Sequence, residues 1–495
     1  MPALSAWPCV QMGADLHLYT HPDLQATVCE RGGAHLILLG YALDPDAPDD
    51  ADADIAARLA QVADTPEALF EQTVRLGGRW VIMAVGPRRQ VLFHDPGGLR
   101  SVVYMRDAAG LVWCASQPEL LRRARPLAGD ADAQHAFLES PYMAHEPEAW
   151  WPGDRTPYAG VRHLLPNHAL DLHRGATWRY WPRVPRPSLS FEDGAAAGAD
   201  LLRRLFDAAA RRQPLAVAMT AGLDSRLLLA AARSLVPTAR FFTHDYYTID
   251  ARHPDARIPQ RLADTFGLRY QWIDAESPRA FFASEDPRIG TFREAYSASV
   301  TTATTARAPA AYALSEALPP ESLHVKGNMS EITRRYYARF VNPDVVPLDG
   351  SALATLTGMG DNAFAARHFQ AWRDAAAGPL REAGYDLLDV FFWEQRIGRW
   401  EAQDQAEMDF ALDAFTPFNC RALLETLLAV APQHRGQPSE ALHLALIERL
   451  WPEVMTVPVN PPTLRKRVAR LVRPVLRHAG VRRWARWLRL RLAQR

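Results

Sequence analysis

Lysine is almost absent from this sequence of 495 residues: 54 of its 56 basic residues are arginine, and only Lys326 and Lys466 remain. An ammonium is a compact point charge that arginine does not reproduce, so either lysine is a candidate for chemistry. Chance retention in an arginine-rich sequence explains each of them equally well. Cysteine is rare too, with four residues in no metal-binding or disulfide spacing, which favours a reducing compartment.

Long apolar runs are also missing. No run of eighteen apolar residues occurs, and the first residues lack the basic-then-apolar order of a secretory signal. We therefore expect no transmembrane helix and a cytoplasmic location. The formal net charge of zero and the hydrophobic content of 48% are those of an ordinary globular protein, long enough for two or more domains.

The zero net charge hides a polarised chain. Residues 465–495 hold twelve of the basic residues and no acidic one, which leaves 44 basic and 56 acidic residues, a charge of −12, in the rest. Arginines alternate there with Leu, Val and Trp at helical spacing, as in a basic amphipathic segment. Two interpretations stay open: contact with an anionic membrane, at its inner face, or docking onto the acidic body. A nucleic-acid partner is the least favoured.

The most informative stretch is 215–232, where a short apolar strand meets a small-residue turn and an alanine-rich helix. Such a turn directs backbone N–H groups and the positive end of the helix dipole at one point, which suits an anion. Thr220 and Ser225 add hydroxyl groups. Asp224 would repel a bare phosphate, so its position indicates a bridging Mg²⁺. The alternative is an ordinary strand–turn–helix with an Asp-Ser cap.

The stretch Met-Thr-Ala-Gly-Leu-Asp-Ser at 219–225 resembles the Ser-Gly-Gly-x-Asp-Ser pyrophosphate loop of ATP pyrophosphatases, particularly the asparagine-synthetase-like amide ligases. A second stretch, His-Val-Lys-Gly-Asn-Met-Ser-Glu at 324–331, is similar to the family's Ser-Gly-Glu-Gly-Ala-Asp motif. Gly327 matches its close-approach glycine and Glu331 its acidic metal ligand. Lys326 and Asn328 depart from the motif, as Ala221 departs from the glycine of the loop.

The resemblance implies two sets of site residues. Catalytic roles fall to Asp224, Ser225, Lys326 and Glu331, with Asp224 and Glu331 also holding Mg²⁺. The ATP-binding set consists of Thr220, Ala221, Gly222, Leu223, Asp224, Ser225, Phe242, Thr243, Gly327 and Asn328. Phe242 and Thr243 would line the adenine and ribose pocket through their backbone. Two roles stay open for Arg226, contact with a phosphate or exposure to solvent. Two also stay open for Asp255, contact with the substrate or capping of a helix.

The first 125 residues are rich in short apolar segments, with Leu-Gly-Gly-Arg-Trp at 76–80 and His-Asp-Pro-Gly-Gly-Leu-Arg at 94–100. They resemble the glutaminase domain of class II amidotransferases. That family needs a cysteine exposed as the first residue, whose α-amino group serves as the base. Here Pro2 follows Met1, and Cys9 lies in a poor context for cleavage. We expect a degenerate domain that hydrolyses no glutamine and has a structural or partner-docking role.

The expected fold is α/β: an Ntn-hydrolase-like α+β sandwich followed by a doubly wound parallel-sheet PP-loop domain with a helical C-terminal part. The expected divisions are the glutaminase-like domain at 1–125, a linker at 126–189, the ATP-binding domain at 190–464 and the basic tail at 465–495. Strands of the parallel sheet are predicted at 215–219, 239–243, 270–273 and 323–326, and helices at 190–211, 224–234 and 255–266.

The implied activity is an ATP- and Mg²⁺-dependent ligase that activates a carboxylate as an acyl-adenylate, releases pyrophosphate and forms an amide on attack by an amine or ammonia. The carboxylate is a small molecule or a peptide, and a partner protein is one source of the nitrogen. By analogy, a sugar acid of surface polysaccharide is a candidate substrate. Two alternatives stay open: a macrolactam cyclase of the lasso-peptide or β-lactam type, and a nucleotide-binding pseudoenzyme.

Overall fold

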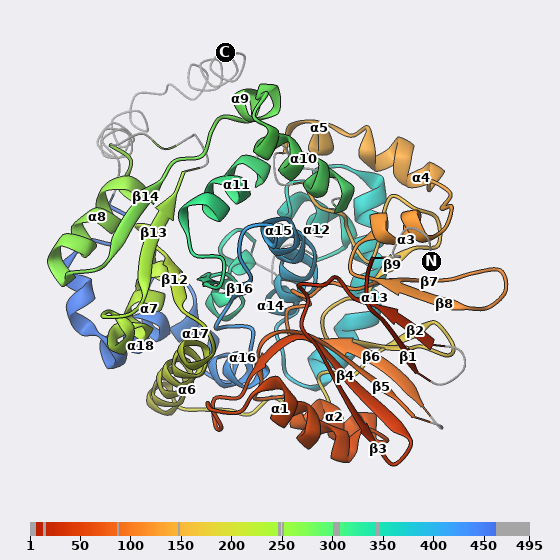
Figure 1. Cartoon of the computed structure of the whole chain (residues 1–495). Helices are drawn as coiled ribbons and strands as arrows, with labels where there is room; N and C mark the ends of the chain where they lie inside the picture. The colour runs from red at the N-terminus through yellow and green to blue at the C-terminus, as the bar shows by residue number, and fades with distance from the viewer. Residues whose placement is uncertain are drawn as a thin grey trace, which may run out of the picture.

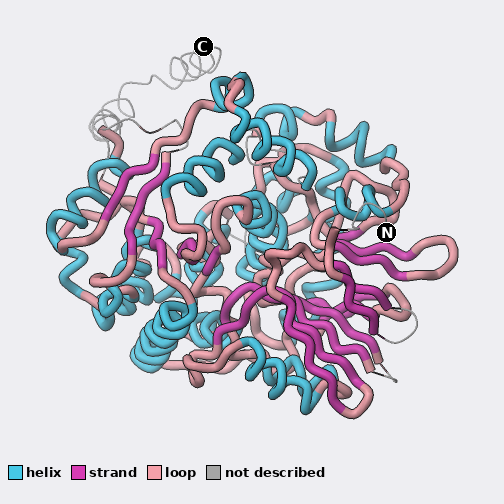
Figure 2. Tube along the Cα trace, viewed as in Figure 1, coloured by secondary structure: helices cyan, strands magenta, loops and turns pink. Residues whose placement is uncertain are grey.

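Two kinds of β-sheet organise this mixed α/β chain. The computed structural model describes residues 6–12, 16–86, 89–146, 149–245, 249, 252–299, 307–341 and 347–461. These residues form a five-stranded parallel sheet and antiparallel sheets of six, three and two strands. The antiparallel sheets lie on the right of Figures 1 and 2, and the parallel sheet on the left. The predictions for Met1, Pro2, Lys466 and the tail concern residues outside the described ranges.

The six-stranded sheet forms the centre of the N-terminal half. Its order is β11 (Ala176–Arg179), β10 (His168–Asp171), β6 (Gln90–His94), β5 (Gly77–Val85), β4 (Ala34–Leu43), β3 (Ala26–Arg31). Side chains alternate across a strand, so Leu36 and Leu38 of β4 face one side and Ile37 the other. The first side packs on α1 (Asp52–Leu59) and α2 (Pro66–Gln72).

The other side of this sheet is covered by strands. They are β1 (Cys9–Met12), β2 (Leu16–Tyr19), β7 (Val103–Arg106), β8 (Val112–Ala115) and β9 (Arg162–His163). Met12, Ile37 and Leu170 belong to the apolar layer between them. Strands β9 to β11 come from residues 126–189, the segment expected as a linker. That segment therefore contributes to the sheets of the N-terminal half.

The parallel sheet has the order β14 (Tyr270–Ile273), β13 (Arg240–His244), β12 (Leu215–Ala218), β15 (Leu323–Val325), β16 (Ala414–Phe415). The predicted strand at 270–273 is confirmed in both bounds, and the other three within one residue at each end. The short β16 lies in a region expected to be wholly helical. Its backbone pairs with β15, which sequence periodicity over two residues does not reveal.

Helices cover both faces of the parallel sheet. Ala216, Phe242 and Ile273 face α11 (Arg307–Ala317) and α15 (Ala402–Met408). Val217 and Phe241, one residue away in each strand, join the main core on the opposite face. That face carries α6 (Phe191–Arg212), α7 (Leu223–Ala231), α8 (Pro254–Phe266) and α18 (Ala441–Leu450). The main core runs without interruption into the N-terminal half, through Trp80 and Phe93.

The remaining helices surround these two sheets. They are α3 (Pro118–Ala124), α4 (Ala131–Ala133), α5 (Pro141–His145), α9 (Pro278–Ala283), α10 (Pro287–Ser299), α12 (Gly350–Leu356), α13 (Ala363–Glu382), α14 (Leu387–Phe391), α16 (Arg421–Leu428) and α17 (Pro432–Arg435). Short 3₁₀ or π segments follow at η5 (Ser330–Arg334), η7 (Phe392–Glu401) and η8 (Pro452–Thr456). Within the described ranges, no helix combines the length and apolar character that crossing a membrane requires.

Candidate functional site

The candidate site lies where the strand order of the parallel sheet reverses. The chain proceeds from β12 to β13 and β14 on one side, then returns to place β15 on the other side of β12. Val217 of β12 is in register with Val325 of β15, so both strands end at the same edge. In open α/β sheets, ligands bind at such a switch point, outside the carboxyl ends of the strands. The two loops singled out in the sequence follow these two strands.

The first loop is folded around two hydroxyl groups. The Oγ1 of Thr220 and the Oγ of Ser225 lie 3.0 Å apart, and Gly222 N–H donates to Thr220 Oγ1 at 3.1 Å. Helix α7 then begins at Leu223, and its first i→i−4 bond runs from Arg226 N–H to Gly222. The N–H groups of Leu223, Asp224 and Ser225 consequently have no partner within the helix and are donors for an anion.

Ala221 fits this loop without strain, because its φ is not positive and a methyl group is tolerated. Its N–H donates to Asp255 Oδ1 at 2.7 Å, and its carbonyl accepts from Asn460 N–H at 2.8 Å. Asp255 therefore holds the loop backbone, while His253 occupies the N-cap of α8. In this structure the Ala221 amide is already engaged, which leaves the α7 amides as donors to a ligand.

The second loop packs directly against the first. A Cβ on Gly327 would lie 3.3 Å from Asp224 Cβ, tighter than most contacts, so this position suits glycine. Met329 is buried with a φ of +73°, a strained conformation that is typical of functional sites. Ser330 Oγ and the Arg334 guanidinium both donate to Asp224 Oδ1. The structure thus brings Asp224 and the Glu331 segment together.

Glu331 is a half-buried residue with one unpartnered carboxylate oxygen. Burial, with the nearby charge of Asp224, raises the pKa of Glu331 to about 8. Its Oε2 is shielded from solvent and accepts no hydrogen bond. An orphaned carboxylate oxygen beside a second carboxylate fits a divalent cation. No group of three His, Cys, Asp or Glu side chains in the described residues could hold a metal, so phosphate and water would complete a Mg²⁺ shell here.

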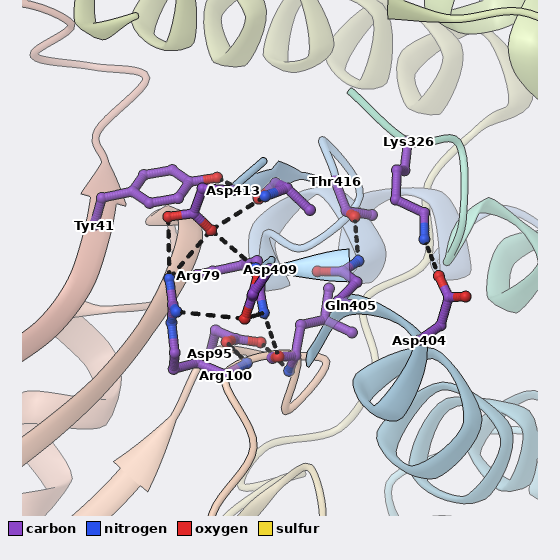
Figure 3. Close-up of polar contacts among 12 residues, drawn as sticks. Tyr41, Arg79, Asp95, Arg100, Lys326, Asp404, Gln405, Asp409, Asp413 and Thr416 are labelled. Atoms are coloured by element: carbon purple, nitrogen blue, oxygen red, sulfur yellow. Dashed lines mark hydrogen bonds and ion pairs between the residues drawn. The ribbon is translucent and has the colours of Figure 1, made fainter. Parts of the chain in front are cut away.

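Lys326 begins the second loop, and its ammonium is paired with two acidic residues of η7 and α15. Its Nζ contacts Glu401 Oε1 at 3.0 Å and pairs with Asp404, as Figure 3 shows for Asp404. The side chain is 11% exposed, so a ligand at the edge of the sheet could reach only a small part of it. Burial, and then the charge of Lys326, lowers the pKa of His244 to about 4, so this neighbouring imidazole is neutral at pH 7.

The remaining predicted site residues are less accessible to a ligand at this edge of the sheet. Phe242 and Thr243 lie in β13 with buried side chains, and Thr243 Oγ1 donates to the Met219 carbonyl at 2.7 Å. Any contact of these two with a nucleotide would be through the backbone, as expected. Leu223 is buried in the core, and Asn328 is half-buried between Gly327 and Met329.

Arg226 contacts neither a phosphate position nor solvent, which corrects both expectations. It is fully buried, and its guanidinium donates to the carbonyls of Val454, Val457 and Pro458 at 2.5, 2.6 and 3.3 Å. The reason is that η8 and the following residues pack behind α7, where its first turn would otherwise face water.

Sequence reasoning missed several groups around the two carboxylates. Arg334 bridges Asp224 and Glu440, with 3.2 Å from its Nε to Glu440 Oε1. His443 is buried with neither ring nitrogen hydrogen-bonded, and burial, with the charge of Arg334, lowers its pKa to about 3. The spacing of Ser330, Glu331 and Arg334 along one short helix was a usable signal. Nothing local marks Glu440, which directly precedes α18, or His443, which lies within it.

Comparison with known proteins adds no relative: the chain matches no protein-family model and no curated protein sequence.

Proposed function

We propose that the chain is an ATP- and Mg²⁺-dependent amide-forming ligase of the asparagine-synthetase-like, PP-loop type. It activates a carboxylate as an acyl-adenylate, and an amine or ammonia then attacks the adenylate. The observation that carries this proposal is the meeting of two acidic loops at the switch point of a parallel sheet, with Asp224 and Glu331 side by side and one carboxylate oxygen unsatisfied.

The residues present support distinct roles in this reaction. The α7 amides, with Thr220 and Ser225, bind and orient the β- and γ-phosphates and stabilise the leaving pyrophosphate. Asp224 and Glu331 would hold Mg²⁺, which neutralises charge as the α–β bond breaks. Arg334 pairs with Asp224 and thereby compensates part of the negative charge at the site.

The test is carboxylate-dependent exchange of pyrophosphate into ATP. Asp224→Asn and Glu331→Gln should each lower the exchange rate at least about 100-fold, because each removes one metal ligand, while the fold is kept. Asp200→Asn is the matched control, since that carboxylate lies exposed on α6 and pairs with Arg203 and Arg204. Exchange that survives in both site variants would refute the metal role.

The carboxylates that support exchange separate the remaining alternatives. Exchange with small acids or uronic acids supports the ligase, and exchange with a peptide alone supports a macrolactam cyclase. If ATP binds but no carboxylate supports exchange, the proposal of catalysis is wrong and a nucleotide-binding role is left.

A further inference from the structure

A residue of the N-terminal half, Arg79, binds the α15–β16 segment, which in turn contacts Lys326. Arg79 of β5 is 1% exposed, and its guanidinium reaches across to the C-terminal half. It donates to both oxygens of Asp409, at 2.5 and 3.1 Å, and to Asp413 Oδ1 at 2.8 Å. Arg100 adds a second contact to Asp413 at 3.2 Å, and Figure 3 shows the four side chains together. Such a bidentate arrangement is directional as well as electrostatic.

The two carboxylates stand at the junction of α15 and β16. Asp409 is the C-cap residue of α15, and Asp413 directly precedes β16. Tyr41 of β4 adds a third contact from the N-terminal half, because its hydroxyl donates to the Ala414 carbonyl at 2.6 Å. The N-terminal half therefore holds the end of a helix and the start of a strand at one place.

Lys326 is held by the same helix and strand from the other side. The ammonium of Lys326 is bound by Asp404, in the first turn of α15, and by Glu401, the residue that precedes this helix. Its backbone N–H donates to the Phe415 carbonyl of β16 at 2.9 Å. The neighbouring His324 N–H donates to the Asp413 carbonyl at 2.9 Å. Both the side chain and the backbone of Lys326 thus depend on the segment that Arg79 fixes.

We propose that Arg79 is a positioning residue for Lys326, and that the N-terminal half serves the candidate site by holding the α15–β16 segment. This role needs no glutamine chemistry. The effect on Lys326 stands on the contacts themselves, and only its consequence for catalysis rests on the proposed function.

A second ion pair between the halves is the control. It separates an effect on the position of Lys326 from a general contribution to the contact between the halves. Arg212 at the end of α6 pairs with the buried Asp52 of α1, and its Nη1 donates to the Asp50 carbonyl at 2.8 Å. This pair also joins the two halves, but its contacts are with α1 and the residues before it rather than with α15 or β16. Arg212→Met and Asp52→Asn are therefore the controls for Arg79→Met and Asp409→Asn.

Because the chain has only two lysines, the reactivity of Lys326 can be measured by chemical labelling. Reductive methylation of the full chain, followed by mass spectrometry, gives the labelling rate of Lys326 relative to Lys466. In the unaltered protein Lys326 should react slowly, because its amine is clamped by two carboxylates. Arg79→Met should raise the relative rate at least about fivefold, since the flexible lysine stem is released once its carboxylates move. Arg79→Lys, which keeps the charge but not the bidentate contact, should fall between.

Equal rates in the Arg79 and Arg212 variants, or no change in either, would overturn the proposal. Should Arg79→Met fail to fold, Asp409→Asn against Asp52→Asn decides the question by the same comparison. The labelling does not require activity, so it gives a result even if the protein exchanges no pyrophosphate. Where exchange is found, Arg79→Lys should lower kcat more than it raises the KM for ATP, and Arg212→Met should leave both within twofold.

Discussion

At the scale of single residues, the guanidinium of Arg226 forms the polar centre of the contact between α7 and the segment around η8. Three carbonyls, those of Val454, Val457 and Pro458, converge on it within the core. Burial lowers the pKa of Arg226 to about 10, which still leaves it charged at pH 7. These hydrogen bonds join the first turn of α7, directly after the first loop, to the segment around η8.

Arg226→Met should lower the free energy of unfolding by about 2–5 kcal/mol, because it leaves buried carbonyls without a charged donor. The measurement is a urea titration followed by circular dichroism. Arg203→Met is the control, since that side chain is 51% exposed on α6, and its loss should cost less than about 1 kcal/mol. Similar costs for the two variants would show that Arg226 contributes no buried hydrogen bonding.

At the scale of elements, the pair α12 and α13 depends on a close backbone approach. A Cβ on Gly350, the first residue of α12, would lie 2.0 Å from the Ala366 carbonyl oxygen and 2.8 Å from Gln370 Cβ. Neither neighbour is the free end of a flexible side chain. Glycine is therefore required there for packing and not for an unusual φ.

Gly350→Ala should destabilise the fold by at least about 1–3 kcal/mol, because the two helices must move apart. Gly290→Ala, within α10, is the matched variant: an added Cβ meets nothing within 4 Å there beyond its chain neighbours, and no proline follows this glycine. It should stabilise the protein by up to about 1 kcal/mol through helix propensity. Thermal unfolding of the two variants tests this opposition in sign, and a neutral Gly350→Ala would contradict the packing argument.

Sequence patterns predicted those helices and strands whose bounds are marked by nearby residues of the sequence. The strand at 270–273 and the helix at 255–266, which starts one residue earlier at Pro254, are bounded by turns and caps that can be read locally. Strand β16 and the π segment η7 arise from pairing and packing with distant chain. The same distinction holds in the site. Asp224 and Glu331 follow readable strands, whereas Glu440 directly precedes α18 and His443 lies within it, about a hundred residues further along.

At the scale of the whole molecule, buried histidines set the response to acid. Burial lowers the pKa of His244 to about 4 and that of His443 to about 3, and it takes those of His163 and His324 well below the usual 6.5. In the unfolded chain these imidazoles bind protons near pH 6.5, but in the folded chain they do not. The contribution of these imidazoles to stability is therefore fully present above that pH and is lost as the pH falls toward the folded values.

The melting temperature should accordingly fall steeply between pH 6.5 and pH 4, with each imidazole contributing up to about 1.4 kcal/mol per pH unit. His443→Leu removes one of the four and should flatten this dependence, measured by calorimetry across the range. His135→Gln is the control, because that side chain is 78% exposed on the surface. An unchanged slope in His443→Leu would show that this imidazole is protonated in the folded state.

The single main core has a consequence for how the chain can be divided. Trp80 and Phe93 of the antiparallel half share that core with Leu205 and Phe415 of the parallel half. Severing the polypeptide between the halves would turn interior surfaces of both pieces toward water, at a cost that grows with the apolar area uncovered. We therefore expect neither fragment to fold alone, because each half provides part of the apolar interior of the other.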